Sequence, residues 1–450
     1  MRCTVTAVFV FLLAGLKTGM AQELPDDSGI SALVRAVSAD SLRSYVEKLV
    51  SFGTRHTLSN RTDPERGIGA AQHWLLQQFR SFSAEGKGRL KVTLDTWQQP
   101  ADGKRVNRPI VMANVMAVLP GTDTADHRVF IITAHLDSRR TNVMDSTGDA
   151  PGANDDASGV AALLEMARVM GSHPRAATIM WVAVSGEEQG LLGAAHLAEK
   201  MKQAHREVAA MINNDMIGQS TAGGTDLQDN TRVRVFSEGI PRAETPAQAA
   251  LRRATGGEND SPSRELARYI KAAADRYVDN LTVKLIYRSD RFLRGGDHLP
   301  FTERGYTAVR ITDYYENYTH QHQDVRKANG IIYGDLTRFM DFAYLRKNTG
   351  LNLAAVAELA AAPSVPQEVK MDVRELSNKT RLYWKAPAHG RVKGYYVLMR
   401  ETDQPMWQRR FFTSSETLIL PYSKDNYFFA VQAIGEDGSR SLPVFPAIGR

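Results

Sequence analysis

The chain has 450 residues, of which 43% are hydrophobic and 24% charged, so it is a globular chain long enough for two or three domains and not a disordered one. The formal net charge is +6, and removal of residues 1–21, with Arg2 and Lys17, would lower it to +4. This mild excess comes without a basic stripe interleaved with aromatic side chains, which argues against nucleic acid as a partner.

The first 21 residues have the pattern of a signal peptide. Arg2 is the positive start, Val5 to Leu16 is a short apolar run, and Gly19 and Ala21 place small residues before a cleavage site. The run is too short to cross a bilayer comfortably, so we expect cleavage near Ala21, a secreted or periplasmic protein, and no stable membrane insertion. The single cysteine, Cys3, lies in this segment, so the mature chain would have no disulfide and no thiolate ligand.

Residues 22–110 have the pattern of a helical and irregular lead-in. Apolar residues at helical spacing predict helices over residues 41–49 and 69–82. A propeptide could occupy the stretch between Gln22 and about Arg61, and the sequence leaves open whether it is removed.

From Val111 onward, strands and helices alternate along the chain. Near-continuous apolar runs are typical of strands buried on both faces of a sheet. The polar, Gly-rich residues 220–262 predict surface loops. The alternation predicts an α/β fold, a three-layer α/β/α domain with a mostly parallel central sheet over residues 22–362 and its core at about 111–350. The expected strands cover residues 113–119, 128–134, 178–184, 207–212 and 306–311, and the expected helices cover 159–170, 191–201, 263–278 and 329–359.

The C-terminal part of the chain has a different pattern. Residues 360–366 have the composition of a linker, and residues 363–450 contain short alternating runs separated by turns, which predicts a small β-sandwich. This module resembles fibronectin type III, with Trp384 in an early strand and Tyr427 in the tyrosine-corner position. It carries no site chemistry, and we expect it to be a spacer or to bind a surface or partner. The runs cover residues 381–384, 394–400, 407–412, 417–420 and 426–433.

Acidic and histidine residues gather directly after the predicted strands. In open α/β sheets, ligands bind at the carboxyl ends of the strands, where loops bring distant residues together. Each cluster alone is weak evidence, because a structural histidine, a helix cap or a solvated turn would also explain it. Five such clusters occur, at residues 134–138, 152–159, 185–193, 213–218 and 318–324.

The residue types in these clusters suit a metal centre. Asp137 is close enough to His135 to accept a hydrogen bond from the imidazole nitrogen that faces away from a metal. Helix capping explains one of the two carboxylates at residues 155–156 but not both. Glu187 and Glu188 end an apolar strand, where one can be a ligand and the other can exchange a proton with water. Nitrogen and oxygen donors without soft ligands suit Zn²⁺, with Mn²⁺ or Co²⁺ still possible.

In order and spacing, the five clusters resemble the zinc-dependent exopeptidases typified by bacterial leucyl aminopeptidase, the co-catalytic dizinc aminopeptidases of metallopeptidase clan MH. The resemblance spans residues 40–350 and implies a three-layer α/β/α fold and a hydrolase that removes N-terminal residues from peptides or proteins with a free N-terminus. It implies Glu187 as general base and Asp137 as the partner of His135. The implied ligands of the two zinc ions are His135 and Asp215 for one, Glu188 and His320 for the other, and Asp155 as the bridge.

The last cluster contains two histidines. The family pattern has a histidine followed four residues later by an acid, which His320 with Asp324 satisfies and His322 does not. We therefore expect His320 as the ligand and His322 as a neighbour. The segment 296–298, Gly-Asp-His, also resembles a family segment near the site, and no ligand is assigned there.

Two alternatives stay open. A carboxypeptidase or dipeptidase of the same fold needs a cation for the substrate carboxylate, and Arg288, Arg291, Arg294 and Arg310 lie before the last cluster. A non-catalytic cell-surface binding protein would use the β-sandwich, but it would be expected to have lost ligands or the base, and all are present. A glutaminyl cyclase is disfavoured, because the complete ligand set suits a metal pair.

Overall fold

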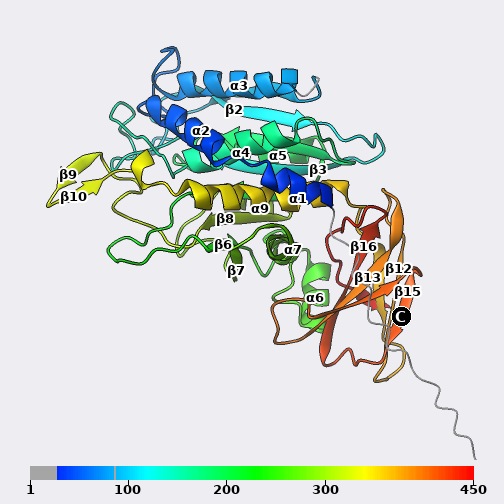
Figure 1. Cartoon of the computed structure of the whole chain (residues 1–450). Coiled ribbons are helices and arrows are strands. Elements are labelled where there is room, and N and C mark those ends of the chain that lie inside the picture. Colours follow the sequence, from blue (N-terminus) through cyan, green and yellow to red (C-terminus); the bar gives the residue numbers. More distant parts are fainter. Residues whose placement is uncertain (1–27, 86–87, 450) are drawn as a thin grey trace, which may run out of the picture.

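The computed structural model describes residues 28–85 and 88–449 (Figure 1). The predicted signal peptide, with Cys3, lies outside these residues. An α/β domain extends to residue 361, and a β-sandwich begins at residue 367 beside one end of it. Over the described part of the chain, no helix combines the length and apolar character needed to cross a membrane.

A single eight-stranded sheet forms the middle of the α/β domain. Its strands are β1 (Lys91–Gln99), β2 (Ile110–Leu119), β3 (Arg128–His135), β4 (Thr178–Val184), β5 (Glu207–Asn214), β6 (Arg232–Phe236), β7 (Thr282–Ile286) and β8 (Ala308–Asp313). They lie in the order β1-β2-β4-β3-β5-β8-β6-β7. The pairs β3–β4, β3–β5, β5–β8 and β6–β7 are parallel, and the other three pairs are antiparallel. The predicted α/β fold with a mostly parallel sheet is confirmed.

Helices cover both faces of this sheet and explain the apolar central strands. Every residue of β3 is buried, as a strand covered on both sides requires. One face shares a large core with α1 (Ser28–Arg35), α2 (Ala39–Ser51), α3 (Ile68–Glu85), α4 (Ala157–Met170), α7 (Pro262–Tyr277) and α9 (Phe342–Ala361). The other face packs on α5 (Leu192–Gln203) and α8 (Leu299–Thr302), around Val182, Met211 and Phe301.

Two strands of the sheet lie in regions that the sequence pattern predicts to be irregular. β1 lies at the edge of the sheet, where none of its residues is fully buried, so it lacks an apolar run. The predicted loops at residues 220–262 contain β6 and also α6 (Pro246–Thr255). β6 is a five-residue strand that alternates Arg and Val, and its position in the sheet comes from pairing with β7 and β8.

The predicted helix over residues 329–359 is also too long. Its first part is a small hairpin, β9 (Arg326–Ala328) with β10 (Ile331–Tyr333), followed by the 3₁₀ turn η1 (Thr337–Phe339). Asn329 and Gly330 have φ of +50° and +78°, which is the Asn-Gly turn chemistry of a hairpin. The helix α9 begins only at Phe342, after the N-cap Asp341.

The C-terminal part is a sandwich of two antiparallel-rich sheets, which confirms the predicted β-sandwich. Its strands are β11 (Gln367–Asp372), β12 (Thr380–Lys385), β13 (Val392–Glu401), β14 (Arg409–Thr413), β15 (Thr417–Leu420), β16 (Tyr427–Gly435) and β17 (Ala447–Gly449). One sheet has the order β15-β12-β11-β17 and the other β14-β13-β16. Trp384 is buried between them, edge-on to Tyr395.

Tyr427 begins β16 as predicted, but its tyrosine-corner role is wrong. In the part of the chain that the structure describes, its hydroxyl makes no hydrogen bond, and its ring instead packs edge-on against Tyr422 with the centroids 5.6 Å apart. A tyrosine corner needs the hydroxyl bonded to the backbone a few residues upstream. The relation to fibronectin type III therefore stays a prediction that rests on the sandwich alone.

A buried set of charges joins the two domains. It consists of Asp260, Glu265 and Arg268 of the α/β domain and Arg400 of β13, and we call it the interdomain cluster. Arg268 pairs with Asp260 at 2.8 Å and with Glu265, and Arg400 pairs with Asp260 at 2.5 Å. Trp407 donates its indole N–H to Glu265 at 3.0 Å. Because every charge has an opposite partner, this cluster fixes the sandwich against α7.

Candidate metal centre

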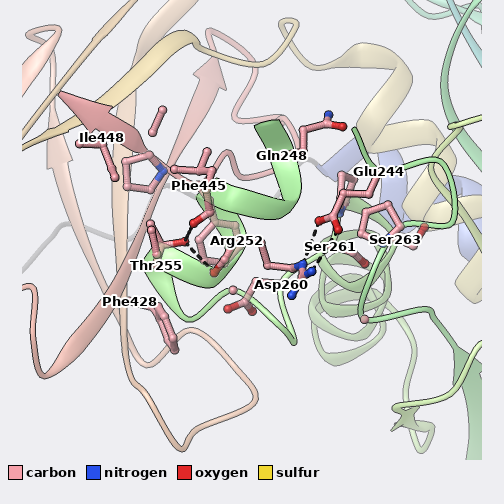
Figure 2. A pocket seen from close by; sticks show the side chains of 18 of the residues that line it. Glu244, Gln248, Arg252, Thr255, Asp260, Ser261, Ser263, Phe428, Phe445 and Ile448 are labelled. Carbon is pink, nitrogen blue, oxygen red and sulfur yellow. Dashed lines mark hydrogen bonds and ion pairs between the residues drawn. The ribbon is translucent and has the colours of Figure 1, made fainter. Parts of the chain in front are cut away.

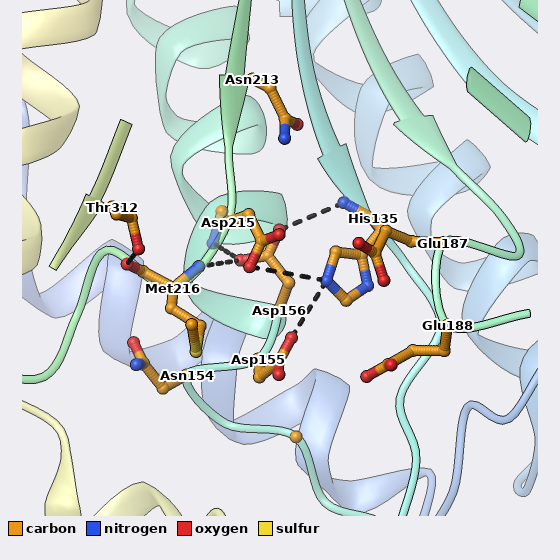
Figure 3. A network of polar contacts seen from close by, with 12 residues as sticks. His135, Asn154, Asp155, Asp156, Glu187, Glu188, Asn213, Asp215, Met216 and Thr312 are labelled. Atoms are coloured by element: carbon orange, nitrogen blue, oxygen red, sulfur yellow. Dashed lines mark hydrogen bonds and ion pairs between the residues drawn. The ribbon is translucent and has the colours of Figure 1, made fainter. Parts of the chain in front are cut away.

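The carboxyl ends of three neighbouring strands bring most of the predicted residues to one edge of the sheet. His135 is the last residue of β3, Glu187 and Glu188 follow β4, and Asp215 follows β5. Asp155 precedes α4 and points to the same place (Figure 3). The convergence follows from the parallel pairing of β3 with β4 and β5.

Five side chains form two overlapping groups, and we call them together the ligand cluster. His135, Asp155 and Asp215 form one group and Asp155, Glu188 and His322 the other, with the ligand atoms of each group within 4.8 Å of one another. The Nε2 atom of His135 lies 3.0 Å from Oδ1 of Asp155, and the Nε2 atom of His322 lies 3.0 Å from its Oδ2. Each oxygen of Asp155 therefore faces a different imidazole, and Asp155 is the residue that the two groups share.

The remaining distances complete the two groups. The Oδ1 atom of Asp215 lies 3.9 Å from Nε2 of His135, and Oε1 of Glu188 lies 2.9 Å from Nε2 of His322. Four of the five predicted ligands, His135, Asp155, Glu188 and Asp215, are thus brought together.

The fifth predicted ligand, His320, does not reach the cluster. Its Nδ1 atom lies 3.0 Å from Oε1 of Gln219, and its ring stacks on Phe339 with the centroids 3.8 Å apart. His322 occupies the place expected for it. His322 has a left-handed backbone with φ of +56°, a turn that the spacing of residues does not reveal.

The acid four residues after His320 is also engaged elsewhere. Asp324 accepts a hydrogen bond from Nε of Arg140 at 2.7 Å and stays half-exposed. The spacing pattern therefore predicts the wrong histidine: the structure places His322 in the ligand cluster, and Asp324, the second residue of the pattern, serves an ion pair outside it.

The adjacent residues Asp155 and Asp156 have separate roles, and the peptide bond between them is cis. Asp156 is the N-cap of α4 and accepts hydrogen bonds from the N–H groups of Gly159, His135 and Met216 at 2.9, 3.1 and 3.2 Å. Capping thus uses Asp156 and leaves the carboxylate of Asp155 for the two histidines.

Asp335 holds the backbone of Asp155 in place, a role that no motif in the sequence indicates. Its carboxylate accepts the N–H of Asp155 at 2.7 Å and the N–H of Asn154 at 2.9 Å. Asp335 lies in the stretch that the sequence pattern predicts to be helical, where it resembles an ordinary polar residue of a helix.

Asp137 acts differently from the prediction. Its backbone carbonyl, not its carboxylate, is the partner of Nδ1 of His135, at 3.0 Å, while the carboxylate lies 3.8 Å away. The carboxylate instead accepts the N–H groups of Gly186, Glu187 and Glu188 at 2.8, 3.2 and 3.1 Å. Asp137 therefore fixes both the imidazole and the turn that carries the two glutamates, and it is a positioning residue.

The lead-in segment is built into the site. Arg55 is completely buried and donates to the carbonyl oxygens of Leu136, Pro151 and Gly152 at 2.8, 2.6 and 2.9 Å. The hydroxyl of Thr57 donates to Asp137 at 3.1 Å. These contacts show that Arg55 and Thr57 support the loops that carry the ligand cluster.

Arg310 lies behind Asp215 on β8. It is completely buried, and its Nη2 atom lies 2.9 Å from Oδ1 of Asp215 while Nη1 lies 3.1 Å from Asp290. This arginine orients Asp215 from the side away from the cavity. From the sequence alone Arg310 is a candidate substrate-binding cation, because nothing in the sequence shows that β8 lies beside β5.

The charges of the site call for cations. Burial alone would lower the pKa of His322, but Glu188 and Asp155 raise it to about 10, and burial is outweighed in the same way at His135, whose pKa is raised by Asp155 and Glu187. Burial raises the pKa of Glu187, with Glu188 and Asp215 adding to this effect and His135 opposing it. The nitrogen and carboxylate donors fit Zn²⁺ or a similar divalent metal, since they supply negative charge and borderline ligands around two positions.

A cavity of about 660 Å³ opens over the ligand cluster. It is the place where a substrate can reach these groups, because Glu187 and four members of the cluster line it. Its other walls come from the loops after β1, β3, β4 and β7 and from the loop that carries His322. The lining residues are Arg105, Arg139, Asp155, Glu187, Glu188, Gly190, Leu191, Asp215, Arg291, Leu293, Arg294, Gly295, Tyr318, Gln321, His322 and Gln323.

A second cavity, of about 560 Å³, lies between α6 and the β-sandwich (Figure 2). Its charges are largely paired, as Arg252 is with Glu244 at 2.8 Å. Among the described residues, neither metal-type group lies in it. Both metal-type groups found among the described residues therefore lie at the first cavity.

The fold and the site together define a metal-dependent hydrolase whose candidate metal ligands lie at the carboxyl ends of parallel strands. Comparison with known proteins agrees. Residues 114–343 match Peptidase family M28. A probable zinc metalloprotease of Leptosphaeria maculans is 42% identical over 96% of this chain and 99% of its own length, and one of Pyricularia oryzae is 43% identical over 95% and 86%. The chain belongs to peptidase family M28.

Solved structures share the fold at low sequence identity. LapB of Legionella pneumophila is similar with a TM-score of 0.54 and 18% identity, over 75% of this chain and 76% of that one. The LapA aminopeptidase of the same species has a TM-score of 0.53 and 18% identity over 80% of each chain. A glutaminyl cyclase of Macrostomum lignano has a TM-score of 0.52 and 17% identity, over 74% and 93%. Because a peptidase and a cyclase share this fold, the fold alone does not select the reaction.

Proposed function

We propose that this chain is a secreted, dizinc aminopeptidase. The main support for this proposal is the geometry of Asp155, whose two carboxylate oxygens each lie 3.0 Å from a different imidazole. Asp215 completes one group of ligands and Glu188 completes the other. His135, Asp155 and Asp215 would hold one zinc ion, and Asp155, Glu188 and His322 the other. The relatives named zinc metalloproteases support the choice of metal. Secretion rests on the signal-peptide pattern of residues 1–21.

Glu187 is the residue best placed to transfer a proton between the attacking water and the leaving nitrogen. When bound, the two metal ions would supply an acidic water molecule and polarise the peptide carbonyl. Glu187 lines the cavity beside the ligand cluster, so it can take the proton of the attacking water and return it to the departing nitrogen. Its pKa is raised in the metal-free chain, and two divalent cations beside it would bring the carboxylate back toward its ionised form.

The other residues of the site hold these groups still. Asp137 holds the turn of Glu187 and Glu188 through three backbone N–H groups. Asp335 holds Asp155 through its backbone, and Arg310 holds Asp215 through its carboxylate. Catalysis needs such support, because small misplacements of reacting groups reduce the rate steeply.

A second candidate, a carboxypeptidase or dipeptidase of the same fold, is favoured by one observation. Arg291 and Arg294, two of the arginines considered from the sequence, line the cavity and could hold a substrate carboxylate. Arg310 is buried against Asp215 and Asp290, and it does not line the cavity. Arg288 is exposed and does not line the cavity either.

Chromogenic aminoacyl amides and N-blocked dipeptides, tested side by side, distinguish the candidates. Each substrate is tested on the purified protein, after chelation and after zinc is returned, with Glu187→Gln as control. Chelator-sensitive cleavage of only the free-amine substrates would establish an aminopeptidase. Cleavage of only blocked dipeptides with a free carboxylate would establish a carboxypeptidase. No cleavage by a protein that holds two zinc ions would contradict the proposal and favour a binding role.

A further inference from the structure

The cavity between α6 and the β-sandwich lies apart from the metal centre (Figure 2), and we call it the interdomain cavity. Its volume of about 560 Å³ is in the usual range for sites that bind small molecules, and such sites occur preferentially between domains. No described residue lines both this cavity and the one over the ligand cluster. A molecule held here would therefore not contact the metal ligands.

The helix α6 forms one wall of the interdomain cavity. Its ends are fixed locally, by a capping box at Thr245 and by Gly256, which closes the helix with φ of +71°. All ten residues of α6 are described, and none of them is buried. Gln248, Leu251 and Thr255 follow one another at intervals of three and four residues, which places them on one face, and all three line the cavity. The face that a helix usually buries against a core is thus turned toward the cavity.

Aromatic side chains form the wall on the sandwich side. Phe428 of β16 and Phe445, which precedes β17, both line the cavity. The guanidinium of Arg400 lies 4.4 Å from the ring centroid of Phe428, and the ring of Trp407 packs against Phe445 with the centroids 5.4 Å apart. Arg400 and Trp407 also bind the acids of the interdomain cluster. The aromatic wall is therefore held in place by the same contacts that join the domains.

Glu238, two residues after β6, brings a buried carboxylate to the cavity. Its side chain is 6% exposed, and among the described residues its Oε2 atom has no hydrogen-bond partner. The guanidinium of Arg242 stays 3.9 Å away, is 41% exposed and also pairs with Glu303 at 3.7 Å. Burial raises the pKa of Glu238 to about 7. A buried carboxylate without a close partner is costly, so this group favours the approach of a cation.

Asp260 supplies a second unpaired oxygen to the same lining. Its Oδ1 atom accepts hydrogen bonds from Arg268 and Arg400 at 2.8 and 2.5 Å. Its Oδ2 atom, within the described part of the chain, has no hydrogen-bond partner. Two buried carboxyl groups of the lining thus retain an oxygen that can accept a hydrogen bond from a ligand.

The charges of the whole lining are negative on balance. Arg252 is bound by both oxygens of Glu244, at 2.8 and 3.1 Å, so it has little left to offer an anion. A ligand that complements the cavity would therefore carry a positive charge on an apolar body. The acids of the lining are Glu238, Glu244, Asp260 and Asp425, and its cations are Arg252 and Lys424.

We propose that the interdomain cavity binds a small organic cation, an ammonium group on an apolar body, with Glu238 as the partner of the ammonium and Phe428 and Phe445 against the apolar body. A charge-assisted hydrogen bond to Glu238 would fix the head of the molecule, and the aromatic wall would bury the rest of it. Such a molecule would touch both domains at once. This site does not depend on the proposed peptidase function.

Calorimetric titration of the full chain in excess zinc tests the site. Zinc is added so that the amine does not compete for an empty ligand cluster. Phenethylamine is compared with phenethyl alcohol, which has the same apolar body and no charge. We expect the amine to bind about tenfold more tightly or better, as one charge-assisted hydrogen bond would give. Equal binding of the two molecules, or no binding of the amine, would overturn the proposal.

Phenylalanine distinguishes two sources of the cation, since simple amines and free apolar amino acids share this chemistry. Lys424 lines the cavity and would pair with the carboxylate that only the amino acid carries. Tighter binding of phenylalanine than of phenethylamine, lost in Lys424→Gln, would identify free amino acids as the ligands. Tighter binding of phenethylamine would identify simple amines. These titrations measure binding and not hydrolysis, so a protein without peptidase activity still gives a result.

Variants locate the binding. Glu238→Gln keeps the size of the side chain and should weaken the amine about tenfold while leaving the affinity for phenethyl alcohol unchanged. Thr255→Trp fills the cavity from the exposed helix α6 and should abolish the binding of both molecules. Glu199→Gln removes an exposed acid that lines neither cavity, and it should change neither affinity. Amine binding that survives in both cavity variants would place the site elsewhere and contradict the proposal.

Discussion

The interdomain cluster and the ligand cluster are both buried, but they differ in how their charges are compensated. In the interdomain cluster, two acids, Asp260 and Glu265, face two arginines, Arg268 and Arg400, and all four are at most 3% exposed. In the ligand cluster, three acids face only two histidines, and Glu187 adds a fourth carboxylate.

The difference shows how a structural charge cluster can be told from a functional one. A buried charge is tolerated when an opposite charge and hydrogen bonds accompany it. The interdomain cluster supplies its own counter-charges and holds two domains together. The ligand cluster has only part of its counter-charge: Arg310 pairs with Asp215, whereas Asp155 and Glu188 face histidines, whose pKa values are raised. This arrangement leaves a site that favours cations. The following predictions test this contrast.

The largest effect is expected at Glu187. Glu187→Gln removes the proton acceptor while keeping the size and most contacts of the side chain, so kcat should fall by about 10²–10⁴. Zinc content, measured by mass spectrometry on the same samples, should stay at the wild-type value, because the ligand cluster is intact. A variant that loses zinc along with activity would assign Glu187 to the ligands.

Substitutions in the interdomain cluster should lower the free energy of unfolding and leave the catalytic activity unchanged. Arg268→Met leaves Asp260 and Glu265 with too little positive charge, and breaking a buried pair in this way costs about 3–5 kcal/mol. Urea unfolding followed by tryptophan fluorescence measures this loss, and the activity of the folded fraction should be retained. The exposed pair of Lys385 and Glu368 offers a control, since Lys385→Met should leave the unfolding midpoint unchanged.

The two histidines of the last cluster provide a matched pair of variants. His322→Ala removes a side chain of the ligand cluster and should weaken binding of one zinc ion by about 100-fold or more, because even outer-shell partners of a metal contribute 10–100-fold. His320→Ala removes a ring that stacks on Phe339 and should leave zinc affinity unchanged. Calorimetric titration of the metal-free proteins measures both. The opposite result would restore the ligand that the spacing pattern favoured.

The smallest predicted effect is a dependence of zinc binding on pH. The pKa of His322 is raised to about 10 in the metal-free chain, so its imidazole is protonated at pH 7 and must lose that proton to bind metal. Zinc affinity should therefore rise with pH, about tenfold per unit for each proton released. Titrations in buffers of different ionisation enthalpy count the protons. A heat of binding independent of the buffer would show that no proton is released.

The sequence by itself determined the strands and the positions of most ligands. Apolar runs such as residues 128–134 and 178–184 require burial on both faces, and parallel strands place the residues that follow them at one edge. That logic located His135, Glu188 and Asp215. The edge strands β1 and β7 and the short strand β6 escaped it, because they are held by pairing with neighbours and carry no apolar run of their own.

Only the tertiary structure decided between neighbouring residues on a loop. His320 and His322 are two residues apart, and the backbone turn at His322 decides which one faces Asp155. The partners of Asp137, the position of Arg310 behind Asp215 and the support from Asp335 likewise arise from segments far apart in sequence. Local sequence patterns encode periodicity and burial, whereas loop geometry depends on long-range contacts. For this reason the sequence predicted where the site lies, and only the tertiary structure showed which side chains form it.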